Sequence, residues 1–284
     1  YVAGRRPTDL LFFTPDMAST ASGDHLSLVA DLRAAIDSDQ LRLHFQPKIN
    51  LRTGRVEGVE ALLRWLHPRL GLLSPGAFIP LAESTGLIDL VTRKSITLAL
   101  AQSRHWLDEG LELPVSVNLS GRSVRDERVV DVVAKGLTRW QVPPSQLTLE
   151  VSDTELLRDP ERTALTVNGL SALGVNLSLD AAGAGLAVFT AIHALPIREL
   201  KFDRTFLTDM TCLTGGEAVV RSTIALAHHL GLRVVAEGIE DEATLRTLVT
   251  LRCDSAQGNY FCPPLAADQL RTWLLERQRD AVNA

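Results

Sequence analysis

A regular alternation of short strand-like segments with helical segments runs along most of this chain. The strand-like segments read LRLHFQPKINL, VEGVEALL, LPVSVNLS, LTLEVSD, VNLSLD, ELKFD, LRVVAEG and CDSAQGNYF. Helical periodicity fills the segments between them, such as LIDLVTRKSITLALAQSRHWL and AVVRSTIALAHHLG. This alternation predicts parallel strands joined by right-handed crossovers. Eight strands in about 260 residues favour an α/β fold of the TIM-like (β/α)8 barrel type over an open doubly wound sheet.

The first two dozen residues differ in composition from the rest of the chain. Residues 1–24 mix Pro, Ser, Thr and Gly around a short apolar patch and show no helical period, so we predict a linker there. From residue 25 the pattern is globular, which predicts one barrel domain over residues 25–284. The barrel therefore accounts for nearly all of the chain.

Net charge and cysteine content limit the classes of partner and compartment. A net charge of −5 without a long basic run argues against binding of DNA or RNA. No apolar run approaches the roughly 20 residues of a membrane-spanning helix. The three cysteines form no CxxC pair and no even set, which fits a reducing compartment. We therefore predict a cytoplasmic location, although a parent protein could carry a membrane anchor elsewhere.

Polar side chains stand where the predicted strands end, which is where barrels of this type carry their chemistry. In chain order they are Glu60, Asn118, Glu150, Asp153, Asp180, Lys201, Asp203, Glu237 and Gln257. Any single acid could merely be solvated or cap the next helix. As a set, however, facing carboxylates repel one another and require raised pKa values or cations between them. Oxygen-rich sites of this kind suit Mg²⁺ or Mn²⁺, and two such ions can hold a phosphodiester for attack by water.

Lys201 admits two interpretations. It lies two residues before Asp203 on one predicted strand, so both side chains point to the same face. The lysine could form an inward ion pair with Asp203 or Asp180. Alternatively, it could orient or deprotonate the attacking water.

Several motifs in order resemble the EAL domain family from about residue 26 to about residue 275. They are VEALLRW, GLLSPGAFIPLAESTGLI, SVNLS, LTLEVSDTEL, LKFDRTF, VVAEGIED and CDSAQGNYFCPPL. The resemblance implies a TIM-like barrel that binds cyclic di-GMP, which active members cleave to linear pGpG with two Mg²⁺ or Mn²⁺ ions. The leading segment LLFFTPDM resembles the closing strand of a GGDEF domain, which implies that the chain is the C-terminal part of a larger signalling protein.

The resemblance also implies a role for each matching site residue. Four side chains are assigned to a first metal ion: Glu60, Asn118, Glu150 and Asp180. Asp180 also bridges to a second ion, which Glu237 completes, while Asp203 lies nearby. Three side chains are assigned to catalysis around the attacking water and its metal: Lys201, Glu237 and Gln257. Three positions match those that hold the dinucleotide: Gln46, Leu62 and Arg64.

One loop departs from the family pattern. Where the family has Asp-Asp-Phe-Gly-Thr-Gly, residues 180–185 read DAAGAG. Ala181 therefore has no oxygen to offer the second metal ion, and Asp153 replaces a longer glutamate that braces this loop in the family. We predict a weakened second metal site, and hence a receptor or regulatory domain that binds cyclic di-GMP but is impaired in hydrolysis.

Two other functions stay open on the sequence. The chain is an active phosphodiesterase if water or Asp203 replaces the missing ligand. It is a protein-interaction module if the barrel binds no nucleotide. EAL-like domains often pair near the altered loop, so a homodimer is also expected.

Overall fold

In the part of the chain that the structure describes, nine strands form one sheet that closes on itself. The computed structural model describes residues 22–181, 186–203, 206 and 216–283. The strands are β1 (Leu41–Asn50), β2 (Val56–His67), β3 (Gly71–Leu73), β4 (Val115–Asn118), β5 (Leu147–Ser152), β6 (Asn176–Ala181), β7 (Glu199–Phe202), β8 (Arg233–Ala236) and β9 (Ser255–Ala256). Their order is β1-β9-β8-β7-β6-β5-β4-β2-β3, and β1 also pairs with β2. The predicted eight-stranded barrel is thus confirmed, with β3 as an added edge strand on β2.

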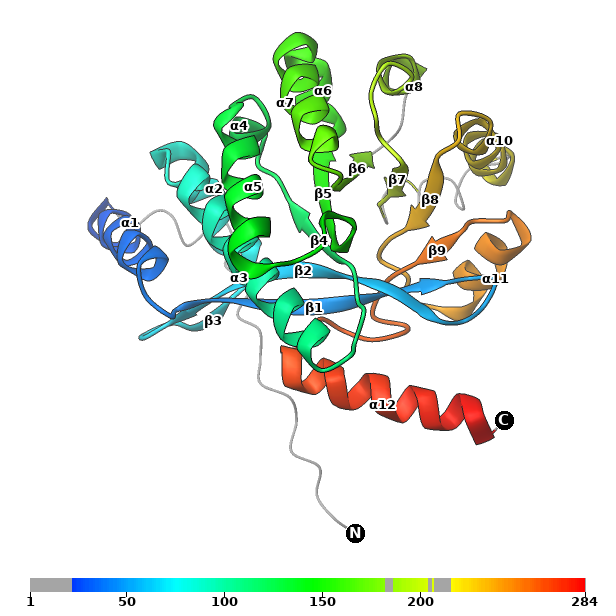
Figure 1. The fold of residues 1–284 in the computed structure, drawn as a ribbon, viewed down its shortest axis with the longest axis horizontal. Coiled ribbons are helices and arrows are strands. Elements are labelled where there is room, and N and C mark those ends of the chain that lie inside the picture. Colours follow the sequence, from blue (N-terminus) through cyan, green and yellow to red (C-terminus); the bar gives the residue numbers. More distant parts are fainter. Residues whose placement is uncertain (1–21, 182–185, 204–205, 207–215, 284) are drawn as a thin grey trace.

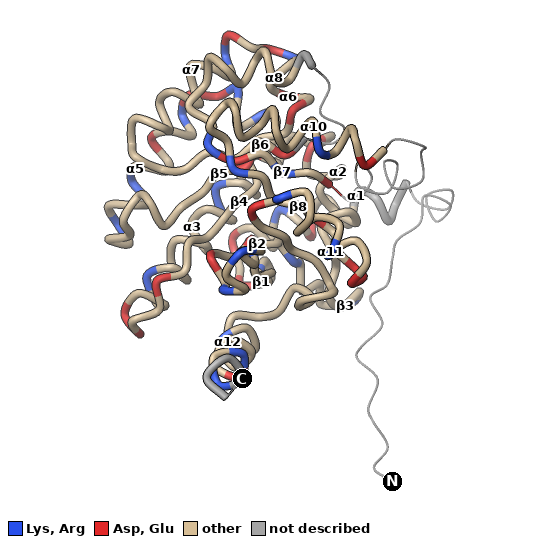
Figure 2. The backbone as a smooth tube through the Cα atoms, turned by 90° about the vertical axis from the view of Figure 1, so that its right-hand side faces the viewer, with Lys and Arg blue, Asp and Glu red and all other residues tan. Residues whose placement is uncertain are grey.

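Helices cover the outside of this barrel (Figure 1). The described helices are α1 (Ser22–Ile36), α2 (Pro75–Thr85), α3 (Ile88–Asp108), α4 (Gly121–Val124), α5 (Arg128–Trp140), α6 (Asp153–Arg158), α7 (Pro160–Ala172), α8 (Leu186–Ile192), α10 (Gly216–His229), α11 (Glu242–Thr250) and α12 (Ala267–Asn283). Basic and acidic residues are interspersed along the tube in Figure 2, in keeping with the absence of a long basic run. None of the described helices is both long and apolar enough to cross a membrane.

The first strand runs against the predicted pattern. β1 is antiparallel to both of its neighbours, β2 and β9, whereas the other barrel strands pair in parallel. The expectation of parallel pairing throughout is therefore wrong at β1. The reason is the short connection over residues 51–55, because a parallel partner needs a crossover of a dozen or more residues. The side chain of Asn50 accepts hydrogen bonds from the backbone N–H groups of Arg52 and Thr53 and so fixes this turn.

Two apolar clusters hold the elements in place. The larger one joins the barrel interior and the inner faces of the surrounding helices, and it includes an edge-to-face contact between Phe45 and Trp106. The smaller one lies under α1 and α2, where Trp65 packs edge-to-face against Phe78. Since apolar burial contributes about 25 cal/mol per Å², these clusters are the main source of stability and fix the strand ends relative to one another.

A buried ion pair between Lys48 and Glu199 links β1 to β7 inside the barrel. Lys48 Nζ lies 2.9 and 3.1 Å from the two carboxylate oxygens of Glu199. Burial pushes the pKa of Glu199 upward, but Lys48 and, to a smaller degree, Lys201 counter it, and the net effect lowers the pKa. A group with a lowered folded pKa adds stability above its unfolded pKa and loses it as the pH falls through the folded value.

We expect Glu199→Gln to lower the free energy of unfolding by about 3 kcal/mol at neutral pH, because Lys48 then stays buried without a counter-charge. The difference from the wild type should shrink as the pH falls below 4.5, the ordinary pKa of glutamate. Urea denaturation across this range measures both effects. The exposed Glu161→Gln is the matched control and should change stability by less than about 0.5 kcal/mol. A pH-independent loss in Glu199→Gln would contradict the ion-pair explanation.

Candidate functional site

The carboxyl ends of the parallel strands converge on one end of the barrel, which we call the mouth. β2 carries Glu60, β4 ends at Asn118, β5 carries Glu150, β6 carries Asp180 and β7 carries Lys201. Glu237 follows β8 directly, and Gln257 follows β9. Strand register brings these positions side by side, since Asn118 pairs with Glu150 and Asp180 pairs with Lys201.

Lys201 lies at the centre of this set and is only 1% exposed. Its Nζ is 2.6 Å from Glu150 Oε2 and 3.3 Å from Glu60 Oε2, and it also contacts Glu237 Oε1. The structure therefore places the inward lysine against three glutamates. Among the described ion pairs of Lys201, the expected partners Asp203 and Asp180 do not occur. The structure thus shows an inward ion pair, made with Glu60, Glu150 and Glu237, while Asp180 acts on Lys201 through its charge and raises the pKa of the lysine.

Two amide side chains complete the hydrogen bonds of Glu60. Asn118 Nδ2 donates to Glu60 Oε1 at 2.9 Å, and Gln257 Nε2 donates to Glu60 Oε2. Gln257 Nε2 also lies 3.3 Å from Glu237 Oε1. These contacts hold Glu60 in one orientation and join β2, β4 and β9 across the mouth.

The electrostatics of the mouth separate Glu60 from the other two glutamates. Burial acts to raise the pKa of Glu60, but Lys201, Gln257 and Asn118 together lower it below its ordinary value. For Glu150 and Glu237, burial is the largest effect on the pKa, and it raises the pKa of Glu150 to about 7 and that of Glu237 to about 8. Burial also disfavours the charged form of Lys201, yet the surrounding acids hold its pKa well above the ordinary value. Lys201 is therefore a firmly protonated cation in this arrangement.

Three aspartates gather beside the glutamates. Burial raises the pKa of Asp180, and Asp203 and Asp153 raise it further. Asp153, the first residue of α6, is buried, and its pKa is raised by burial and by Asp203. Asp203 Oδ1 accepts a hydrogen bond from the backbone N–H of Phe206 at 2.8 Å. The three carboxyl groups are thus close enough to influence one another, as expected where a cation would be shared.

The donor set of the mouth fits a divalent cation. Glu150 Oε1 and Gln257 Oε1 are buried oxygens without a hydrogen-bond partner in the described part of the chain. Carboxylate and amide oxygens are the ligands that Mg²⁺ and Mn²⁺ prefer. Within the same residues, no three acidic, histidine or cysteine side chains stand in a metal-binding arrangement, and Lys201 Nζ forms ion pairs with Glu60 and Glu150 there. Ala181 ends β6 opposite Phe202, and residues 182–185, on which the loop argument depends, lie outside the described residues.

The three expected nucleotide-contacting positions lie on the β1–β2 pair. Gln46 faces Glu60 across the two strands, and its Nε2 donates to the carbonyl oxygen of Cys262 at 3.1 Å. Leu62 and Arg64 follow Glu60 at alternate positions and so share its face. Burial lowers the pKa of Arg64, whose guanidinium donates only to the Leu63 carbonyl among its described partners. Arg64 is therefore a half-buried cation with donors free for a ligand.

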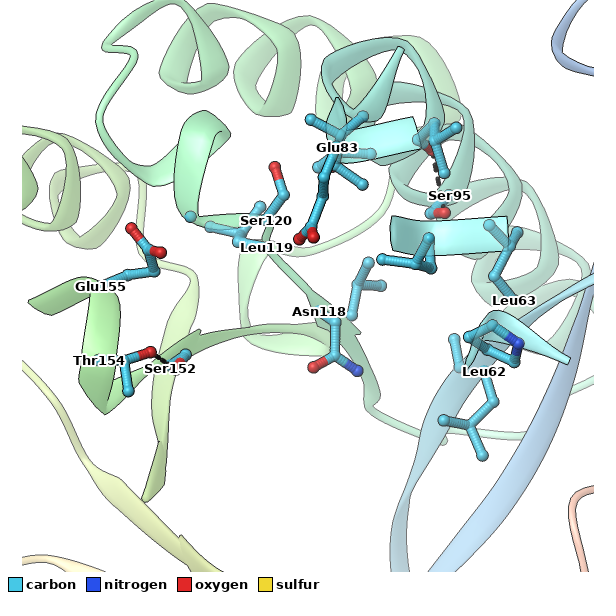
Figure 3. Close-up of a pocket in the computed structure, with 18 residues that line it drawn as sticks. Leu62, Leu63, Glu83, Ser95, Asn118, Leu119, Ser120, Ser152, Thr154 and Glu155 are labelled. Atoms are coloured by element: carbon cyan, nitrogen blue, oxygen red, sulfur yellow. Dashed lines mark hydrogen bonds between the residues drawn. The ribbon is translucent and has the colours of Figure 1, made fainter. Parts of the chain in front are cut away.

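A cavity of about 410 Å³ opens beside the mouth. It lies between β2, β4 and the helices α2, α3 and α6, and Leu62 and Asn118 belong to its lining (Figure 3). The carboxylate of Glu83 points into it from α2. Sequence reasoning missed Glu83 because this residue follows no strand, and the only available signal was its place within the motif PGAFIPLAEST.

The sequence of this chain is similar to those of known proteins. The model of the EAL domain matches residues 29–264. The bifunctional diguanylate cyclase/cyclic di-GMP phosphodiesterase MucR of Pseudomonas aeruginosa is 40% identical over 91% of this chain and 38% of its own length. The cyclic di-GMP phosphodiesterase PA2567 of the same organism is 34% identical over 87% of this chain and 42% of its own length. The chain thus spans about two fifths of these curated relatives.

Solved structures agree with the sequence comparison. The phosphodiesterase of PaMucR in complex with c-di-GMP superposes with a TM-score of 0.81 and 41% identity, covering 86% of this chain and 99% of that one. This chain has the polar mouth at the carboxyl strand ends, the antiparallel first strand and the Glu60-Ala61-Leu62 sequence on β2. The family model spans almost all of the described barrel. The chain belongs to the EAL domain family.

Proposed function

We propose that this chain is a cyclic di-GMP-binding domain of phosphodiesterase type that hydrolyses its ligand slowly. The observation that carries the proposal is Arg64, a half-buried guanidinium with free donors beside an acidic mouth whose oxygens fit divalent cations. Guanidinium groups match the fork of phosphate oxygens. The names of MucR and PA2567 support the same ligand and the same reaction class.

Different residues of the mouth would bind the metal ions and the dinucleotide. Phosphodiesterases of this family depend on divalent metal ions. In this chain Glu60, Asn118, Glu150 and Asp180 would hold one ion, and Asp180, Asp203 and Glu237 would face a second. Bound metal ions would neutralise the negative charge of the phosphodiester. Gln46, Leu62 and Arg64 would hold the dinucleotide against the mouth.

Lys201 and Gln257 serve to orient groups in the mouth. Burial opposes the charged form of Lys201, but the surrounding acids hold its pKa above the ordinary value, and its Nζ donates hydrogen bonds to Glu60 and Glu150. Gln257 bridges Glu60 and Glu237 and fixes their separation. Slow hydrolysis follows from Ala181, because a side chain without oxygen removes one ligand of the second ion. Losing even an outer contact of a metal site typically reduces affinity about 10–100-fold.

An active phosphodiesterase is the second candidate, and Asp203 favours it. Asp203 contributes to the raised pKa of Asp180, which supports Asp203 as a replacement for the ligand that Ala181 lacks. The linker over residues 1–24, a preceding GGDEF-like domain, a homodimer and a cytoplasmic location stay predictions. The bifunctional name of MucR supports the GGDEF-like partner.

We expect the purified chain to bind cyclic di-GMP in calorimetry and to release little pGpG, followed by chromatography, with Mg²⁺ or with Mn²⁺. Arg64→Ala should weaken binding about tenfold or more, because the hydrogen bonds of a charged group to phosphate are lost. Ala181→Asp should raise turnover only partly, since residues 182–185 keep their altered sequence.

Three outcomes separate the candidates. Turnover of the unmodified chain at an ordinary enzymatic rate, about 1 s⁻¹ or more, would reject slow hydrolysis and establish the active enzyme. Absence of binding at millimolar nucleotide, in a chain that unfolds cooperatively, would leave the interaction module. Binding without product would support the receptor function.

A further inference from the structure

A second pocket lies at the opposite end of the barrel from the mouth. It has a volume of about 680 Å³ and is formed where β1 ends, where β2 and β8 begin, and where α11 connects to β9. None of the residues proposed for the mouth belongs to its lining. The proposed function therefore leaves this pocket unexplained.

The two carboxylates that line this pocket are already satisfied. The two carboxylate oxygens of Glu57 each lie 2.7 Å from Arg233 Nη2, which donates to them. Glu57 also accepts hydrogen bonds from the side chains of Ser255 and Asn50. Asp254 Oδ2 lies 2.9 Å from the His228 ring and accepts the backbone N–H of Val234 at 2.8 Å. Arg233 therefore offsets the charge of Glu57, and hydrogen bonds hold the Asp254 carboxylate in place at the floor of the pocket.

Two arginines on the rim have no such partner. Arg52, in the β1–β2 turn, and Arg252, in the α11–β9 connection, both line the pocket and are exposed. Neither side chain forms an ion pair or hydrogen bond within the described residues. The free charge at the pocket is thus positive and comes from segments far apart in the sequence.

The backbone at Arg252 is strained. Helix α11 ends at Thr250 with Leu251 as its C-cap, and the next residue, Arg252, has φ 62, in the left-handed region that glycine normally occupies. The backbone N–H of Arg252 bonds to the carbonyl of Val249, and that of Cys253 bonds to the carbonyl of Leu248, which is the hydrogen-bond pattern of a Schellman cap. Arginine carries a steric cost at this position that glycine would not.

We propose that this pocket binds a small, multiply charged anion of the phosphate class, held between the guanidinium groups of Arg52 and Arg252. Guanidinium forks pair with phosphate oxygens through two parallel hydrogen bonds, and two of them match a ligand with more than one negative charge. The proposal is independent of the activity of the mouth.

The test uses pyrophosphate as the probe, titrated at constant ionic strength in buffer with a metal chelator. Pyrophosphate should raise Tm of the wild-type chain by mass action. Arg52→Gln and Arg252→Gly should each weaken its binding about tenfold or more in calorimetry. Arg55→Gln, an exposed arginine in the same turn but outside the pocket lining, should leave the affinity unchanged.

Arg252→Gly separates lost binding from lost folding. Relief of the strained backbone should raise Tm of the free protein by about 2–4 °C while the pyrophosphate response falls. The Arg64→Ala variant should keep the full response, which excludes binding at the mouth. Adenosine triphosphate serves as a second probe: tighter binding than pyrophosphate identifies a nucleotide as the source of the phosphate groups, and equal binding identifies the phosphate chain alone.

Three results would overturn the proposal. They are no Tm response of the wild type to either probe, an unchanged affinity in Arg52→Gln and Arg252→Gly, and loss of the response in Arg64→Ala.

Discussion

The Lys201→Met variant is expected to lose about 3–5 kcal/mol of free energy of unfolding at neutral pH, the effect of removing one partner from a buried ion pair. Methionine preserves most of the side-chain volume, so the loss measures charge rather than a cavity. Glu60, Glu150 and Glu237 then face one another without the ammonium that now contacts all three.

Acid and divalent cations should both restore part of this loss. Without Lys201 the folded-state pKa values of Glu150 and Glu237 rise further above 4.5, and Glu60 loses the cation that lowers its pKa. The folded state then binds more protons than the unfolded state, so stability increases as the pH falls. Urea denaturation at several pH values, with and without Mg²⁺, measures both. Lys135→Met, an exposed change on α5, is the control. A loss below about 1 kcal/mol in Lys201→Met, in the range of surface pairs, would contradict the buried-pair explanation.

Gly258→Ala is expected to lower the free energy of unfolding by about 3 kcal/mol, the upper range for overpacking. A Cβ at this position would lie inside van der Waals contact of the Ile239 backbone N and O, and 2.7 Å from its Cα. The backbone of Ile239 is itself hydrogen-bonded to Gln257 and Tyr260, so it has no room to withdraw. The loop that carries Gln257 must therefore move.

The displacement of Gln257 should also appear at the mouth. Gln257 would lose its contacts with Glu60 and Glu237, and binding of Mg²⁺ should weaken with the protein still folded in mild conditions. Denaturation and metal titration together measure the two effects. Gly76→Ala in α2 is the control, since a Cβ there meets nothing within 4 Å. Equal stability of the two alanine variants would show that the chain accommodates the contact.

The barrel and the location of the mouth were predictable because each strand couples an apolar alternation to a polar residue at its end. Glu150 and Asp180 illustrate this, since each lies at or near the end of a strand whose other residues are mostly buried. Parallel register then brings such residues together without further information.

Three features could not be predicted from the hydrophobic pattern of the sequence, because they depend on distances between residues in the folded chain. The antiparallel β1 was signalled by the short connection over residues 51–55, but the repeated strand–helix alternation outweighed it. The partners of Lys201 depend on side-chain length and strand stagger, which place glutamates from β2 and β5 against its ammonium. Strand β3 has only three residues and pairs antiparallel with the end of β2, so periodicity could not detect it.

The pairing of β1 with β9 has a consequence during synthesis on the ribosome. The barrel closes through Ile49 opposite Ala256 and Asn50 opposite Ser255, positions roughly 200 residues apart. At about 5–20 residues per second, β9 emerges about 10–40 s after the β1–β2 hairpin. Throughout that interval β1 presents an unpaired edge, so the nascent chain depends on a late two-residue strand to remove its template for association with other chains.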